Sequence, residues 1–148
     1  MAGEEKKQLL SKKTLENVAR IETKIAKTLI KFANKYSLSL KDDLFIRIIG
    51  RDEDYPAYCV YNKGVKLADV GIGEVIELNV MEQFVVSEES IQETIYRSMD
   101  KILLGFDKET KMSQLEIYIF TKQDSGKPLF YLYKDGKPHK QIKSSQIL

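Results

Sequence analysis

Only two side chains in this sequence are of the types that most often carry nucleophilic or metal chemistry. Cys59 is the single cysteine and His139 the single histidine, so neither a His–His metal pair nor a serine triad can form within one chain. A Cys–His dyad would need an activating neighbourhood, and none is visible around either residue. Cys59 falls inside an apolar run, where a free cysteine is typically a small buried hydrophobic residue. We therefore expect no catalytic residue and no enzymatic activity.

Two glycine-containing segments and one acidic segment resemble parts of phosphate or cation sites. Residues 71–73 (GIG) lack the third glycine of the dinucleotide-binding fingerprint and are followed by Glu74. Residues 125–127 (SGK) end like a P-loop, but Pro128 stands where that motif has Ser or Thr. Residues 52–54 (DED) lack the central glycine and further ligands of a calcium loop. The sequence therefore predicts no cofactor and no metal ion.

A basic stripe is the first candidate binding surface. On a helical wheel its five side chains fall within an arc of roughly 80°. They are Arg20, Lys24, Lys27, Lys31 and Lys35. Three interpretations stay open, namely a solvated face, a docking face for an acidic partner or nucleic acid, and a membrane-surface contact.

The second candidate surface lies near the C-terminus, where aromatic residues on neighbouring strands are interleaved with lysines. The aromatic residues are Tyr118, Phe120, Phe130, Tyr131 and Tyr133. Aromatic rings beside lysines can stack bases and neutralise phosphates. They can equally form the core or cross-strand pairs. Tyr131 and Tyr133 share a strand face opposite Phe130 and Leu132, so one of these faces must be core. The candidate binding residues of this segment are Lys122, Tyr131, Tyr133, Lys134 and Lys137.

A long amphipathic helix is expected to position the basic stripe. Ser11 is a suitable N-cap, and no Gly or Pro interrupts residues 12–36. At ~1.5 Å per residue this helix would be about 37 Å long. Its apolar face is opposite the stripe and consists of Leu15, Val18, Ile25, Leu29, Phe32 and Tyr36.

The rest of the chain favours strands around a second helix. Ser87 is a predicted N-cap and Gly105 a helix stop, and the predicted buried face consists of Ile91, Ile95, Met99, Ile102 and Leu103. Residues 75–80 fit a strand by their β-branched content, although Ile76, Val80 and Phe84 also fit helical spacing. The other expected strands are 44–49, 57–61, 65–70, 115–121, 129–133 and a short edge strand at 139–142.

The element order is thus α-β-β-β-(β)-α-β-β-(β), in which the bracketed strands are 75–80 and 139–142. It predicts an α+β fold in which the long N-terminal helix and a second helix pack on a mainly antiparallel five- to six-stranded sheet. The order resembles that of the small dimeric roadblock-type GTPase regulators and of the type III secretion chaperones. The resemblance implies a dimer or a chaperone-like role and carries over no functional residue. Type III chaperones are usually acidic, whereas this chain has a net charge of +2.

Length and composition suit one domain. The chain has 148 residues, 43% hydrophobic and 31% charged, and we expect a single domain over 11–143 with flexible ends at 1–10 and 144–148. One cysteine indicates a reducing compartment, and neither a secretory signal nor a membrane span is visible, so we expect a cytoplasmic protein. Basic residues predominate in 1–36 and 108–148 and acidic residues in 74–100. This pattern fits complementary solvated faces or an anionic partner for the ends.

The leading hypothesis is a non-enzymatic protein–protein interaction module, such as an adaptor, a chaperone-like protein or a regulatory subunit, which forms a homodimer. It is motivated by the lack of catalytic motifs, the long amphipathic helix and the expected open strand edges. One alternative is a sequence-tolerant nucleic-acid binder that uses the basic stripe and the C-terminal lysines and aromatics. Another is a small enzyme of unrecognised class.

Overall fold

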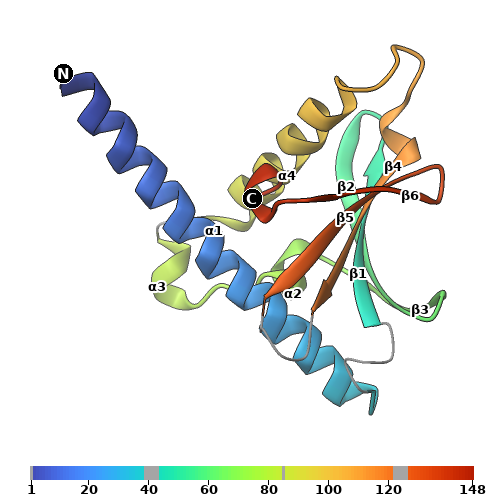
Figure 1. Ribbon diagram of the computed structural model, residues 1–148. Helices are drawn as coiled ribbons and strands as arrows, with labels where there is room; N and C mark the ends of the chain where they lie inside the picture. The colour runs from blue at the N-terminus through green and yellow to red at the C-terminus, as the bar shows by residue number, and fades with distance from the viewer. Residues whose placement is uncertain (1, 39–43, 85, 122–126) are drawn as a thin grey trace.

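Six strands form one antiparallel sheet in the order β3-β2-β1-β4-β5-β6 in the computed structural model of the chain (Figure 1). The strands are β1 (Leu44–Arg51), β2 (Asp54–Asn62), β3 (Val65–Val70), β4 (Leu115–Thr121), β5 (Pro128–Lys134) and β6 (Lys137–Ile142). The helices are α1 (Ala2–Lys35), α2 (Ile72–Val75), α3 (Val80–Gln83) and α4 (Glu88–Leu103), with 3-10 turns η1 (Met112–Gln114) and η2 (Ser144–Gln146). The structure describes residues 2–38, 44–84, 86–121 and 127–148, without the side chains of 2–17 and 121.

The sheet consists of two three-stranded meanders that meet at its centre. β1 pairs with β4 through Ile46 opposite Ile119 and Ile48 opposite Ile117. The helices lie on one face of the sheet, which gives a two-layer molecule (Figure 1). The predicted α+β fold is confirmed, including the edge strand near the C-terminus. None of the described helices is both long and apolar enough to span a membrane.

Two of the hairpins close through the turns that the sequence indicates. Lys63 and Gly64 join β2 to β3 with φ of 50° and 80°, and Asp135 and Gly136 join β5 to β6 with φ of 53° and 75°. Positive φ at both central residues is typical of two-residue hairpin turns, which glycine adopts without strain.

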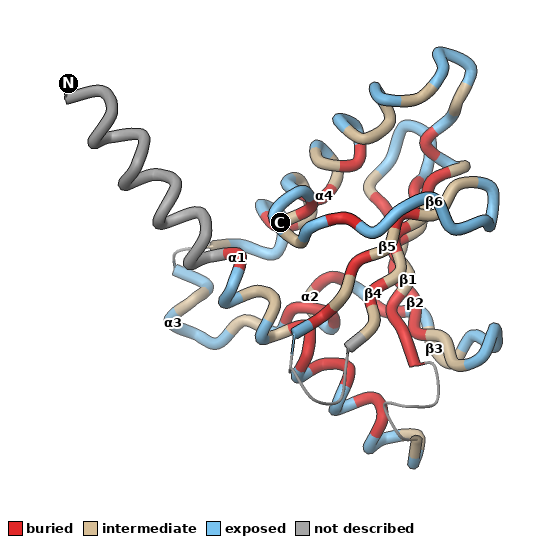
Figure 2. Tube along the Cα trace, viewed as in Figure 1, coloured by how far each residue is buried: buried red, intermediate tan, exposed pale blue. Residues whose placement is uncertain are grey.

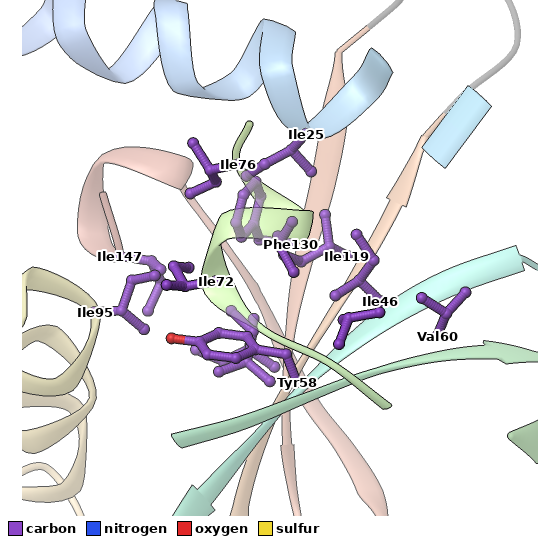
Figure 3. Close-up of a cluster of buried hydrophobic side chains, with 14 of the residues drawn as sticks. Ile25, Ile46, Tyr58, Val60, Ile72, Ile76, Ile95, Ile119, Phe130 and Ile147 are labelled. Atoms are coloured by element: carbon purple, nitrogen blue, oxygen red, sulfur yellow. The ribbon is translucent and has the colours of Figure 1, made fainter. Parts of the chain in front are cut away.

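The core lies between the sheet and the helices. Every second strand residue points into it, so Phe130 and Leu132 are buried while Tyr131 and Tyr133 occupy the opposite face. α1 contributes Ile25 and Leu29, as its apolar periodicity predicts. The cluster is shown in Figure 3, where Ile25 lies over Phe130 and Ile119. α4 buries Ile91, Ile95 and Met99 as predicted, whereas Ile102 and Leu103 of the same predicted face are only partly buried against the core.

The predicted strand at 75–80 is wrong. The chain leaves the sheet after β3, forms α2 and α3, and covers the core instead of adding a strand. Its buried residues Ile72, Val75 and Ile76 have the i, i+3, i+4 spacing of a helical turn. The Thr28 hydroxyl of α1 donates to the Val75 carbonyl at 2.8 Å. This carbonyl, which in a sheet would accept a hydrogen bond from a neighbouring strand, is therefore paired with α1.

Both ends of the chain differ from the simplest expectation. α1 begins at Ala2, so the predicted N-cap Ser11 lies within the helix. At the other end, η2 turns the chain back towards the core and Ile147 is fully buried. The expectation of a flexible C-terminus at 144–148 did not include this packing.

Shortening Ile147 to alanine tests the packing of the C-terminal turn. Removing a buried isoleucine typically costs about 2–5 kcal/mol of unfolding free energy, and we expect Ile147→Ala to fall in this range in urea denaturation. The exposed neighbour Ser145 serves as the control, and Ser145→Ala should change the unfolding free energy by no more than about 0.5 kcal/mol. Equal, small effects of both substitutions would show that the turn does not hold in solution.

Candidate functional site

The face of the sheet turned away from the helices carries six aromatic side chains. Phe45 alternates with the buried residues Leu44 and Ile46, and Tyr118 alternates with Ile117 and Ile119. No helix of the described residues covers this face (Figure 1). We call it the open face and define it by Phe45, Arg47, Tyr61, Glu116, Tyr118, Phe120, Tyr131 and Tyr133.

The six rings form a continuous array across four strands. Phe45 stacks on Tyr61 of β2 with ring centroids 5.7 Å apart and on Tyr118 of β4 at 4.8 Å. Tyr118 in turn stacks on Tyr133 of β5 at 3.8 Å, with the ring planes only 7° apart. Phe120 contacts Phe45 at 4.9 Å and meets Tyr131 edge-on at 5.8 Å. These contacts leave Phe45 only 7% exposed although no helix lies above it.

One ion pair lies within the array. Arg47 donates to a carboxylate oxygen of Glu116, and only 19% and 15% of the two side chains are exposed. The guanidinium lies over the rings of Tyr61 and Tyr118, with its carbon 4.5 and 5.3 Å from the ring centroids. This cation–π geometry holds the arginine flat on the sheet. The charges cancel, so the open face is aromatic and close to neutral.

The Tyr118 hydroxyl and the Cys59 thiol stay protonated at neutral pH. Burial, followed by the nearby Glu116 charge, raises the pKa of Tyr118 to about 12. Cys59, which pairs with Arg47 across β1 and β2, is 2% exposed, and burial raises the pKa of its thiol. A buried, protonated thiol is a poor nucleophile. Cys59 therefore has the environment of a small hydrophobic residue, as its sequence context indicates.

The two outer strands are protected against strand addition. β3 carries a register irregularity opposite Val60 and Tyr61 and an ion pair between Lys66 and Asp69 at 3.1 Å. β6 carries a second irregularity and the exposed residues 137–140 (KPHK). Bulges, charges and proline are the usual means by which proteins block edge-to-edge pairing. The open edges expected from the sequence are present, but their chemistry favours contact through a face.

The basic stripe is partly paired within the chain. Lys24 contacts the Glu82 carboxylate at 2.6 Å and donates to the Glu77 carbonyl at 2.8 Å, and Lys31 lies 3.5 Å from the Glu77 carboxylate. The hydrogen bond from Lys24 is the main cause of the lowered pKa of Glu82. The basic helix and the acidic middle of the sequence thus meet inside one chain. Arg20 and Lys27 are exposed, and the exposed Lys35 lies 5.6 Å from the Tyr36 ring centroid.

The C-terminal lysines and aromatics are not brought together. Lys134 pairs with the core residue Leu115 across β4 and β5, and its amine lies 5.3 Å from the Phe106 ring on the helix side. Lys137 is the partner of Lys134 in the β5–β6 hairpin. Tyr131 and Tyr133 lie on the open face instead. Lys122, the remaining predicted member of this surface, lies outside the described residues.

Cys59 and His139 do not form a dyad. Cys59 is paired with Arg47 and lies on the side of the sheet that carries the open face, whereas the His139 ring packs 5.0 Å from Phe106 on the helix side. Within the described ranges, no cluster of three or more Cys, His, Asp or Glu side chains could hold a metal ion.

Sequence reasoning missed four members of the open face, namely Phe45, Arg47, Tyr61 and Glu116. A signal was present, because the strand residues alternate between the core and these positions along 44–49 and 115–121. In 44–49 every residue except Arg47 is apolar, so polarity alone does not separate the two faces of that strand. Which face the helices cover depends on tertiary packing.

Comparison of the chain with protein-family models, curated proteins and solved structures finds no match. No functional residue is therefore assigned by similarity. We infer function from the chemistry of the open face and of the helical surface.

The pKa of Tyr118 gives a pH test of the open face. Tyr118 has a pKa of about 12 in the folded chain and about 10 when unfolded, so the folded state holds the proton more tightly. Its contribution to stability is complete below pH ~10 and is lost as the pH rises towards 12. Tyr118→Phe cannot ionise, so its unfolding free energy, measured in urea across this range, should fall less than that of the wild type. Parallel pH curves for the two proteins would contradict the buried hydroxyl.

Proposed function

We propose that this chain is a non-enzymatic protein–protein interaction module, an adaptor, chaperone-like protein or regulatory subunit, that binds a partner through the open face and forms a homodimer. The observation that carries the proposal is the array of six aromatic rings on a sheet face that no described helix covers. A contiguous aromatic surface of this kind on a folded domain marks an interaction site. The single cysteine is free and buried, which supports a reducing compartment such as the cytoplasm.

The composition of the open face suits a protein partner. Tyrosine and arginine are the residues most enriched among those that dominate binding energy in protein interfaces, together with tryptophan. The face offers Tyr61, Tyr118, Tyr131, Tyr133 and Arg47. Tyrosine combines apolar contact area with a hydroxyl that can hydrogen-bond at the edge of the contact. These residues supply both parts of a protein interface, an apolar centre and a polar rim.

The open face is also preorganised for binding, because its side chains are already held in place in the free protein. Its rings stand on four paired strands and stack on one another, so few rotamers remain to be frozen. Ordering a flexible side chain at an interface costs about 0.5–1.5 kcal/mol. Aromatic side chains held in place avoid much of this cost, as in antibody paratopes rich in tyrosine.

Its neutral charge favours protein over nucleic acid. Arg47 is paired with Glu116, and Lys66 at the margin is paired with Asp69. Affinity for nucleic acid depends on cations that replace the counterions of the phosphates. Lys134 and Lys137 lie on the other side of the hairpin, away from the stacked rings, so a base stacked on the open face would find no adjacent lysine of this pair.

Replacing open-face tyrosines tests the proposal in a capture experiment from native lysate. We expect Tyr61→Ser with Tyr131→Ser to lose the protein partners that the wild type captures, since each such residue can contribute 2 kcal/mol or more to binding. The matched control is Lys101→Ser with Glu109→Ser, two exposed residues of α4 and of the turn after it that lie on neither candidate surface, and it should capture the same partners as the wild type. Circular dichroism verifies that all three proteins are folded.

Two results would decide against a protein-binding open face. One is an unchanged set of captured proteins in the tyrosine variant. The other is capture that disappears on nuclease treatment and weakens steeply with salt, which would support the nucleic-acid alternative.

A further inference from the structure

α3 presents apolar side chains to solvent and turns its charge inward. Val80, Met81 and Phe84, which directly follows the helix, are 72%, 75% and 83% exposed. Glu82, in contrast, is 12% exposed and contacts Lys24 of α1 at 2.6 Å. Figure 2 shows α3 at the surface beside α1. This orientation is the reverse of an ordinary surface helix, so we call Val80, Met81 and Phe84 the α3 patch and ask what covers it.

A groove lies next to the α3 patch, between α1 and α4. Its volume is about 190 Å³. A cavity of ~150 Å³ in another protein is large enough to bind benzene, so this groove has room for one aromatic side chain. Its apolar lining residues are Ile21, Leu78, Val86, Ile91, Ile95 and Leu148, and its polar ones are Arg20, Lys24, Glu82, Ser90 and Thr94.

The α3 patch and the groove are neighbours on one surface. Glu82 of α3 and Val86, two residues beyond Phe84, both line the groove. The surface therefore has an apolar projection and, beside it, a hollow of matching size and polarity. In a two-fold pair, each copy presents the same surface and every contact occurs twice. A projection beside a hollow is self-complementary under this symmetry.

The charges around this surface also suit a second copy. Arg20, at the groove rim, is exposed and forms no salt bridge with a described residue, although its charge also interacts with Glu82. Glu88 and Glu89 begin α4 just after the patch, and both are exposed. Seating the patch of one copy in the groove of the other brings the acidic first turn of α4 and Arg20 into one interface. Aromatic residues, phenylalanine among them, and methionine are enriched at the centres of protein–protein interfaces.

We infer that two copies of this chain pair about a two-fold axis through the α3 patch, with each Phe84 ring entering the groove between α1 and α4 of the other copy. This inference rests on the homodimer proposed above and gives its geometry. It leaves the open face of both copies free for a partner.

Light scattering of the full-length chain over a range of concentrations tests the inference. The wild type should be a dimer. Phe84→Asp removes the projection, and Thr94→Trp fills the groove from its exposed rim. Each should weaken self-association at least a hundredfold, because a central contact is lost twice. The control is Leu104→Asp, which places the same charge on an apolar residue that is 85% exposed just after α4. It should remain dimeric.

Mixing the two monomeric variants separates a specific contact from a general loss of structure. The Thr94→Trp chain keeps its Phe84, and the Phe84→Asp chain keeps an open groove. Together they can form one of the two contacts, so the mixture should show heterodimers that neither variant forms alone. A folding defect in either variant would not be rescued in this way.

Two outcomes would overturn the inference, and they are distinguishable. A dimeric Phe84→Asp protein would leave the homodimer standing and refute this geometry. A wild type that stays monomeric at all concentrations would refute the homodimer itself, while the capture experiment on the open face still decides the partner-binding proposal. If that monomer floats with phosphatidylcholine–phosphatidylserine vesicles and Phe84→Asp does not, the α3 patch contacts lipid instead of a second copy.

Discussion

The burial of Ile25 and Leu29 of α1 against β1, β4 and β5 is the contact on which the other elements depend. Fully burying such a side chain contributes about 1.5–3 kcal/mol. Thr28, the residue directly before Leu29, donates a hydrogen bond to the carbonyl of Val75 and so holds the segment after β3 against α1. α4 and Ile147 complete the same layer. Because all these elements pack on one face of the sheet, the side chains on the opposite face must cover and stabilise one another.

The open face meets this requirement with rings that cover one another. Phe45 and Cys59 are almost inaccessible there, although their shielding comes from neighbouring side chains on the same sheet. The pair Arg47–Glu116 is held among the rings, where partial burial would penalise either charge alone. The result is a second apolar layer that is one side chain thick. Such a layer is rigid without a covering element, and a partner can cover it without displacing anything.

Much of the fold could be predicted from the sequence, because local patterns and tertiary packing agree over most of the chain. The strand at 115–121 and the buried face of α4 follow from period-2 and period-3.6 patterns that the core then uses. The segment 75–80 was mispredicted because its β-branched residues favour a strand locally, while α1 supplies the hydrogen bond and the burial that favour helical turns. Half of the candidate surface was also accessible to sequence reasoning. Tyr131 and Tyr133 could be placed on one face, and the same alternation puts Lys134 on the other. Their contacts with Tyr118 and Phe120 of β4 depend on the pairing order of the strands, which no local pattern encodes.

The stacking of Tyr118 on Tyr133 gives the molecule an optical property of its own. The chain contains no tryptophan, so tyrosine and phenylalanine dominate its near-ultraviolet absorption. Two phenol rings 3.8 Å apart and nearly parallel form a fixed chiral pair, and side chains held in fixed packing are the source of near-ultraviolet circular dichroism. The near-ultraviolet circular dichroism of this tyrosine pair thus shows whether the open face is folded. Binding of a partner to the open face can be followed by the same signal on the native protein, without attaching a dye.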